Sequence, residues 1–103
     1  MKYRITRADA ADQDLISIIN YIAEESQDLR VALKYLDKLE QAIMNLSDFP
    51  YIGVAPRYKS LRTQGFKVLI IENHLAFYKV SETKKEAEVY RILHGKQDYK
   101  NMI

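Results

Sequence analysis

The sequence predicts an α+β domain in which an N-terminal strand precedes an antiparallel helical hairpin, and three further strands form a C-terminal antiparallel sheet. Between residues 9 and 46, apolar residues recur every three or four positions, which is the period of one helix face. After Gly65 the pattern changes to short apolar runs bounded by polar turns, which is typical of strands. The 103 residues amount to one domain's length of chain. We therefore expect residues 1–103 to form a single domain of order β-α-α-β-β-β, with the hairpin on one face of the sheet.

The first half of the chain supplies one strand and two helices. Residues 2–6 alternate polar and apolar side chains, which predicts a short, half-buried strand. A helix over about residues 9–24, with Asp9 as its N-cap, is predicted by apolar residues on one face, namely Leu15, Ile18, Ile19 and Ile22. Residues 26–28 interrupt this pattern and supply the cap of a second helix, whose apolar face holds Ala32, Leu36, Leu39, Ile43 and Leu46. Because the connection is so short, the two helices are expected to lie antiparallel with both stripes in the core.

The second half supplies the sheet. Residues 50–60 are expected to form a loop and residues 61–63 a short extra strand, and further strands are predicted over 66–71, 75–80 and 87–93. The polar turns between them are 72–74, with an exposed His74, and 81–86. With the hairpin on one face, the other face of the sheet is expected to stay open to a partner. The core is expected to be complete by Leu93, so deletion after Gly95 should leave a folded protein that has lost its activity.

Composition excludes several classes of protein. The chain has no cysteine, which removes disulfides, thiolate catalysis and cysteine-based metal sites. It has no glycine-rich phosphate-binding motif and no histidine or carboxylate cluster at metal-ligand spacing, so we expect neither a cofactor nor a metal. No apolar run approaches the ~18 residues of a membrane-spanning helix, and the N-terminus lacks a signal-peptide pattern. These features predict a cytoplasmic protein without membrane contact.

Charge is divided unevenly between the two halves. Residues 1–48 hold six basic and nine acidic side chains, a net charge of −3, whereas residues 49–103 hold ten and five, a net charge of +5. Residues 54–71 include four basic side chains and no acid. This asymmetry indicates an anionic partner for the second half, such as nucleic acid or an acidic protein. The alternative is a basic face that only contacts solvent.

Several residues of the second half are candidates for function. Lys67 and Arg91 stand within apolar strands, where a charged side chain needs solvent or a ligand, and Lys59 and Arg62 precede the first of these strands. His94 could act as an acid or base near neutral pH, and Tyr99 lies among basic residues as base-stacking aromatics do. Each also has a structural interpretation: solvated charges, a hydrogen-bonding histidine, and a tyrosine that packs on the sheet.

Six segments in order resemble the RelE/ParE superfamily of bacterial type II toxins. They are the run Asp14–Ala23, similar to the family's D-L-x-x-I-x-x-Y-I-A helix; Ala32 with Tyr35, Leu36 and Leu39; Leu46 through Pro50 and Gly53; Leu61-Arg62 with Gly65-Phe66-Lys67-Val68; Phe77-Tyr78-Lys79-Val80; and Arg91-Ile92-Leu93-His94-Gly95 with Asp98. The resemblance covers nearly the whole chain, and the fold known for the family agrees with the order predicted above.

The resemblance implies one of two activities, or neither. RelE-like members are ribosome-dependent endoribonucleases that need no metal, whereas ParE-like members bind and inhibit DNA gyrase. For a nuclease, the candidate catalytic residues are Lys59, Arg62, Lys67, Arg91, His94 and Tyr99. The nuclease pattern is incomplete, because Gln97 replaces an arginine and no tyrosine ends the chain. These departures favour a ParE-like toxin, with a ribonuclease or a degenerate toxin as the alternatives. Target contacts are then expected from Arg62, Lys67, Arg91, Lys96 and Tyr99.

The resemblance also implies partners. A toxin of this kind is neutralised by a cognate antitoxin, and the +5 half of the chain predicts that the toxin-binding segment of the antitoxin is acidic. The expected target is DNA gyrase or the ribosome with its messenger RNA. Operator DNA is expected to be reached only through the antitoxin.

Overall fold

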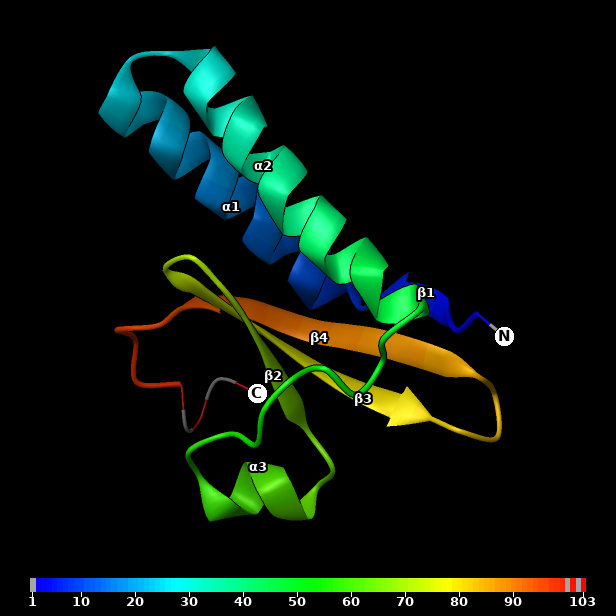
Figure 1. The fold of residues 1–103 in the computed structure, drawn as a ribbon. Helices are drawn as coiled ribbons and strands as arrows, with labels where there is room; N and C mark the ends of the chain where they lie inside the picture. Colours follow the sequence, from blue (N-terminus) through cyan, green and yellow to red (C-terminus); the bar gives the residue numbers. More distant parts are fainter. Residues whose placement is uncertain (1, 100, 102) are drawn as a thin grey trace.

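The computed structural model describes residues 2–99, 101 and 103. Its elements are β1 (Arg4–Arg7), α1 (Asp9–Ser26), α2 (Leu29–Met44), the 3-10 turn η1 (Asn45–Ser47), α3 (Lys59–Thr63), β2 (Lys67–Ile71), β3 (His74–Ser81) and β4 (Glu86–His94). This order confirms the predicted α+β fold, with one short helix added. In Figure 1 the α1–α2 hairpin lies against one side of the sheet and extends beyond its end, and α3 lies on the opposite side.

The hairpin forms where the sequence predicts it. Gln27 leaves α1 in a left-handed conformation (φ 56°), and the side chain of Asp28 accepts a hydrogen bond from the amide of Arg30 to cap α2. Asp9 does not cap α1, because the N-cap position falls on Ala8; Asp9 lies instead in the first turn, where its charge suits the helix dipole. Within the described residues, no helix combines the length and the apolar character that crossing a bilayer requires.

The four strands lie in the order β1-β4-β3-β2. The three C-terminal strands pair antiparallel, and β1 joins β4 in parallel, so the complete sheet is mixed. The turns that connect β2 to β3 and β3 to β4 contain Glu72 and Lys85, both at positive φ, as tight hairpin turns require. A register shift between Phe77 and Tyr78 places a β-bulge opposite them in β4.

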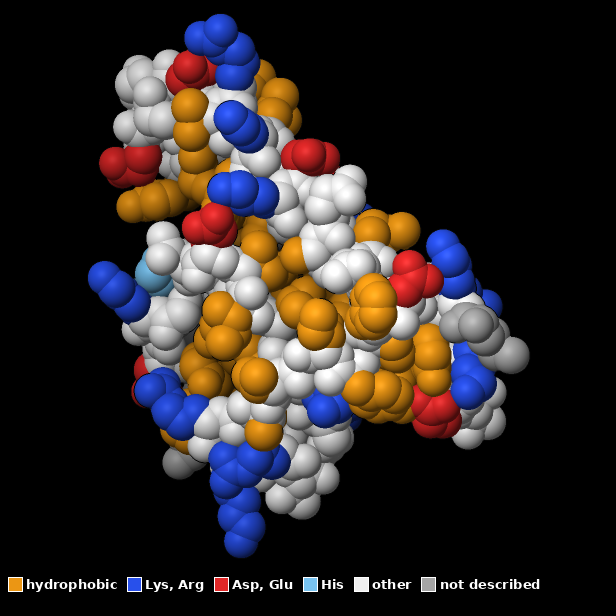
Figure 2. All heavy atoms as spheres, viewed as in Figure 1, with side chains coloured by type: hydrophobic (Ala, Val, Ile, Leu, Met, Phe, Trp, Pro, Cys, Tyr) orange, Lys and Arg blue, Asp and Glu red, His pale blue; other side chains and the backbone are white. Residues whose placement is uncertain are grey.

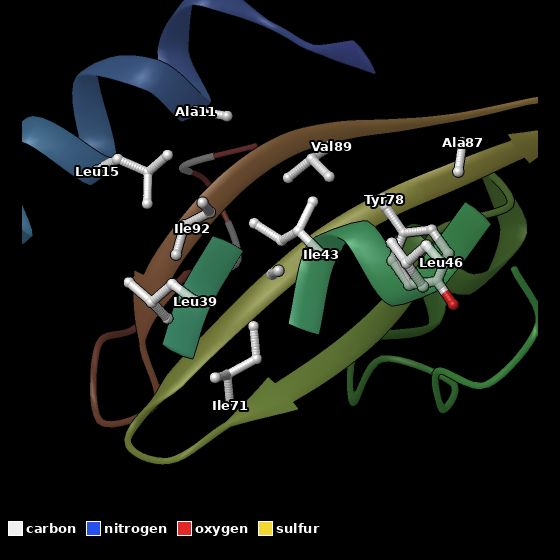
Figure 3. Close-up of a cluster of buried hydrophobic side chains, with 11 residues drawn as sticks. Ala11, Leu15, Leu39, Ile43, Leu46, Ile71, Tyr78, Ala87, Val89 and Ile92 are labelled. Atoms are coloured by element: carbon white, nitrogen blue, oxygen red, sulfur yellow. The ribbon is translucent and has the colours of Figure 1, made fainter. Parts of the chain in front are cut away.

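The main core lies between the hairpin and the sheet. Leu15 of α1 and Leu39 and Ile43 of α2 face Val89 and Ile92 of β4, as Figure 3 shows. Ala11, in the first turn of α1, has no exposed surface, which shows that this turn packs closely against the main core. Leu15, Leu39, Ile43 and Leu46 of the predicted apolar stripes are therefore core, as predicted, whereas Ile19 and Ile22 of α1 lie outside this cluster and are only partly buried.

A second core covers the other face of the sheet, which was expected to be open. Leu61 of α3 and Tyr99 of the C-terminal segment bury their side chains there against Phe66, Phe77 and Leu93. The open-face prediction is wrong because these two segments, which carry few apolar residues, each place one large side chain on the sheet. The prediction that the core is complete by Leu93 is wrong for the same reason, because Tyr99 belongs to this second core.

Residues 61–63 are helical, so the prediction of an extra strand is also wrong. The amides of Leu61 and Arg62 both bond to the carbonyl of Tyr58, which starts a helical turn, and Gly65 ends it at φ +89°. Five residues are too few for helical periodicity to show in a sequence.

The loop before α3 is attached to the edge and the core of the sheet. Val54 and Val68 exchange two backbone hydrogen bonds of 2.9 and 2.8 Å. The buried hydroxyl of Tyr78 donates to the carbonyl of Pro50 at 2.8 Å and accepts from the amide of Gly53 at 2.9 Å. A Cβ at Gly53 would lie 2.6 Å from that hydroxyl, so only glycine fits this approach.

Candidate functional site

Arg62, predicted to bind a target, holds the loop that precedes its own helix. Its guanidinium donates to the carbonyls of Pro56 and Arg57, at 2.9 and 2.7 Å. Lys59 begins the same helix and is exposed. Figure 2 shows Lys and Arg side chains gathered around this end of the molecule. The α3 end therefore presents a basic surface, in which the charge of Arg62 is partly used to shape the loop.

Tyr99 is buried, with 4% of its surface exposed. Its ring packs on Phe77 (centroids 4.8 Å apart) and edge-on to Tyr58 (5.2 Å). The guanidinium of Arg57 lies 5.5 Å from the centroid of the Tyr99 ring, and the hydroxyl of Tyr58 donates to Asp98. Tyr99 thus fastens the C-terminal segment to the domain, and its ring is not presented on the surface.

Lys67 lies in the edge strand β2, next to Val68, which pairs with Val54 of the loop before α3. It begins β2, and its ammonium lies 5.7 Å from the centroid of the exposed Tyr51 ring. No acidic side chain among the described residues forms an ion pair with it. Its charge is therefore available to an anionic partner.

Arg91 forms a fixed ion pair instead of facing an open surface. Its Nε and one terminal nitrogen donate to the two carboxylate oxygens of Asp14, at 2.8 and 2.9 Å. Asp14 also accepts the amide of Ile92 at 2.9 Å, where β4 has passed the end of β1 and the start of α1 takes the place of a strand. The carboxylate holds the pKa of the Arg91 guanidinium above its usual value. Arg91 therefore joins α1 to the sheet edge.

His94 lies at the end of β4, in a tight turn that continues to Gln97. The turn is closed by the amide of Gln97, which donates to the carbonyl of His94, and by the side-chain oxygen of Gln97, which accepts the amide of His94. The amide of Lys96 donates to Nδ1 of His94 at 3.1 Å. The imidazole is thereby held in one orientation, while the side chain of Lys96 remains exposed.

His74, which was expected to be an exposed turn residue, is half-buried beside His94. The two rings meet edge to face, 5.3 Å apart, and the Tyr35 hydroxyl lies 2.6 Å from Nδ1 of His74. Burial and the neighbouring His94 lower the pKa of His74, so the neutral ring is favoured. The predicted strands contained a signal for this pair, because the pairing of β3 with β4 across the turn between Ser81 and Glu86 sets His74 opposite His94. Tyr35 could not be placed, because its contact depends on how the hairpin docks.

A cavity of about 600 Å³ opens beside these histidines, where the hairpin extends past the sheet. Its walls are Ile18 and Ile22 of α1, Tyr35 of α2, and the end of β4. The polar part of its lining consists of Asp14, Ser17, Asn73, His74, Arg91, His94 and Gln97. Apolar walls with a few converging polar groups are typical of a ligand site.

The six nuclease candidates are divided over the sheet. Arg91 and His94 line the cavity on the hairpin side, Lys59, Arg62 and Tyr99 belong to the α3 side, and Lys67 begins the edge strand β2. Within the described part of the chain, no three His, Asp or Glu side chains come together as a metal site would require. The structure thus does not collect the six nuclease candidates around one point.

Comparison with known proteins identifies the family. A sequence model described as the ParE toxin of the type II toxin–antitoxin system, parDE, matches residues 5–99. No curated protein matches the chain.

Solved structures share the fold. The chain is similar to one from the chromosomal ParDE toxin–antitoxin system of P. aeruginosa, with a TM-score of 0.73 and 19% identity over 90% of this chain and 96% of that one. It is also similar to one from the toxin–antitoxin complex RelBE2 of Mycobacterium tuberculosis, with a TM-score of 0.58 and 16% identity over 91% and 99% of the two chains.

Proposed function

The chain belongs to the ParE toxin family of type II toxin–antitoxin systems, and from this premise we propose that it arrests bacterial growth by binding and inhibiting DNA gyrase. A cognate antitoxin neutralises it by occupying its surface. The alternative, cleavage of messenger RNA on the ribosome, requires a catalytic set that this chain carries only in part.

The division of the nuclease candidates between two sides of the sheet carries this proposal. Metal-independent cleavage of RNA needs a base, an acid and a phosphate-binding cation around one phosphate. Arg91 is bound by Asp14 on the hairpin side, and Arg62 holds a loop on the other side. Tyr99 is buried, and Gln97 brings no charge where a nuclease of this superfamily places arginine. The arrangement favours a toxin that acts by binding.

Three lysines are proposed to contact the target. Lys59, Lys67 and Lys96 carry ammonium groups that form no ion pair with any described residue. They belong to the basic half of the chain, and charges of this kind steer and orient a partner more than they stabilise the fold. Arg62 and Tyr99 hold the loop before α3 and the C-terminal segment in place, whereas Arg91 joins α1 to the sheet edge on the hairpin side.

The antitoxin is proposed to bring an acidic segment to the same half of the chain. The two solved structures described above come from toxin–antitoxin systems, and the +5 half offers charge complementarity to an acidic segment. Operator DNA is then reached only through the antitoxin.

Two activity assays in parallel test the gyrase proposal. The purified chain should inhibit supercoiling of relaxed plasmid by gyrase, and addition of the antitoxin should restore it. The same preparation should leave messenger RNA intact in a translation reaction with ribosomes. Ribosome-dependent cleavage without inhibition of gyrase would overturn the proposal, and inactivity in both assays with retained antitoxin binding would indicate a degenerate toxin.

Matched lysine variants test the contact residues. Lys59→Gln combined with Lys67→Gln should weaken inhibition of gyrase about tenfold with little change in melting temperature. Lys34→Gln is the control, since Lys34 is also exposed and unpaired among the described residues but lies on α2. Equal effects of the control and the double variant would remove these two lysines from the interface.

A further inference from the structure

The hydrogen bonds of the two histidines fix where their protons lie. A backbone amide can only donate, so Nδ1 of His94, which accepts from Lys96, carries no proton. The hydroxyl of Tyr35 lies 2.6 Å from Nδ1 of His74 and 3.4 Å from the carbonyl of Ile71, and on this difference in distance we assign the phenol as the donor to the ring. A neutral imidazole with an unprotonated Nδ1 holds its proton on Nε2.

Both rings are thus left with one N–H donor each, beside the cavity that they line. No described residue accepts a hydrogen bond from either Nε2. Gln97 adds a third donor, because its side-chain oxygen is already bonded to the amide of His94 and its NH₂ group remains. Three residues that line the cavity, His74, His94 and Gln97, therefore each carry an N–H donor that bonds to no other described residue.

The chemistry of these three donors selects a singly charged acceptor. The guanidinium of Arg91 is bound by the carboxylate of Asp14, and the imidazoles are neutral, so the three donors offer hydrogen bonds without a free full charge. A phosphate dianion needs compensating cations, whereas a carboxylate is well served by two or three N–H donors. The apolar walls from Ile18, Ile22 and Ile92 suit the stem of a longer side chain or an apolar neighbour on the same peptide.

We propose that the cavity between the hairpin and the end of the sheet receives a glutamate or aspartate side chain of an acidic peptide segment, whose carboxylate accepts hydrogen bonds from His74, His94 and Gln97. This inference rests on the proposed function, in that the peptide belongs to the antitoxin. It adds an attachment point on the hairpin side of the sheet, away from Lys59 and Lys67 and next to Lys96, whose amide bonds to His94.

Two double variants test separately the two ring nitrogens of these histidines: Nε2, which is proposed to donate to the ligand, and Nδ1, which accepts a hydrogen bond within the fold. In a His74→Asn, His94→Asn variant, each amide oxygen can replace Nδ1 and keep the contacts with Tyr35 and Lys96, but the Nε2 donor is lost. In His74→Gln, His94→Gln, the side-chain NH₂ reaches the position of Nε2. The product of the adjacent reading frame should bind the Asn variant at least about tenfold more weakly than wild type, and the Gln variant within about threefold. Melting temperatures of both proteins show whether they are folded.

A small probe tests the three donors without the antitoxin. Nitrogen-15 NMR of the histidine side chains would follow titration of the wild-type chain with N-acetylglutamate N-methylamide, and with its neutral glutamine analogue as control. Saturable shifts of the Nε2 signals are expected for the carboxylate alone, at millimolar concentration.

The outcomes are distinct. Antitoxin binding that is equal in all variants, together with no carboxylate-dependent shift, overturns the cavity proposal and leaves the proposed function standing. Saturable carboxylate shifts in a chain that does not bind the adjacent gene product support the cavity and count against the proposed function. Equal shifts with the glutamine analogue overturn the selection of a carboxylate.

Discussion

Arg91 was expected to contact a target, but the structure shows that it forms an ion pair within the fold. A lone arginine in an apolar strand is compatible with a ligand contact, yet Asp14, 77 positions earlier, binds it through two donors. We predict that Arg91→Ala lowers the free energy of unfolding by about 2–4 kcal/mol, because it leaves the largely buried Asp14 without its counter-charge. Urea unfolding measures this effect.

Matched variants test the same ion pair between Arg91 and Asp14. Asp14→Asn should lower the free energy of unfolding by a comparable amount. The double variant, Arg91→Ala with Asp14→Asn, should lower it by less than the sum of the two single effects. Lys96→Ala, which removes an exposed charge just after β4, should leave the unfolding curve unchanged. Growth arrest lost in Arg91→Ala without any loss of stability would return this arginine to the target interface.

The stability of the fold is expected to depend on pH through the carboxylate of Glu82. In the β3–β4 turn its carboxylate accepts from Lys85 at 2.8 Å, from Tyr51, and from Tyr3 at 2.7 Å, and these donors lower its pKa to about 2. Because the folded pKa lies below the unfolded value of 4.5, this stabilisation is fully present above pH 4.5 and is lost as the pH falls towards 2.

A Glu82→Gln variant tests this dependence. Between pH 5 and 2, wild type should lose more stability than Glu82→Gln, measured by thermal melts at each pH. Glu25→Gln serves as the control, because Glu25 is exposed on α1 and forms no hydrogen bond with a described residue. Parallel pH curves for wild type and Glu82→Gln would show that the three donors do not act through this carboxylate.

The C-terminal segment is the element whose role the structure reverses. Tyr99 fills the second core against Phe77, so the core is not complete at Leu93. We predict that Tyr99→Ala lowers the free energy of unfolding by about 3–5 kcal/mol, as for other buried aromatic residues. Deletion after Gly95 should then unfold the domain, because a domain of this size is stable by only about 5–15 kcal/mol. Circular dichroism melts measure both effects.

One further variant, together with the truncated chain, interprets that result. Tyr99→Phe keeps the buried ring and should retain nearly full stability. A chain truncated after Gly95 that melts like wild type would restore the prediction that the core is complete by Leu93.

The elements could be predicted where a period is long enough to be recognised. The helical hairpin and the β2–β4 strands follow from apolar spacing, and the cap at Asp28 follows from residue type alone. The short α3 and the docking of Tyr99 could not be predicted, because each depends on a few contacts made across the sheet. The cavity was missed for a related reason: its walls come from α1, α2 and β4, which only the packing of the hairpin brings together.

At the scale of the whole molecule, the sheet separates two surfaces of different character. The α3 side carries exposed lysines on the basic half of the chain, and the hairpin side carries the cavity with neutral donors. An antitoxin that reached both would be held by long-range attraction on one side and by short-range hydrogen bonds on the other. The two contributions can be separated, because salt screens the first and hardly affects the second.

We therefore predict that salt slows association of the antitoxin more than it speeds dissociation. Between 0.05 and 0.5 M NaCl the association rate constant should fall about tenfold or more, since screening removes steering towards the +5 half, and the dissociation rate constant should change less. Surface plasmon resonance measures both constants. Lys59→Gln combined with Lys96→Gln should lower the association rate at low salt and match wild type at high salt, whereas the two Asn substitutions at His74 and His94 should raise the dissociation rate at either concentration. An association rate that does not respond to salt would mean that the charge asymmetry plays no part in recognition of the antitoxin.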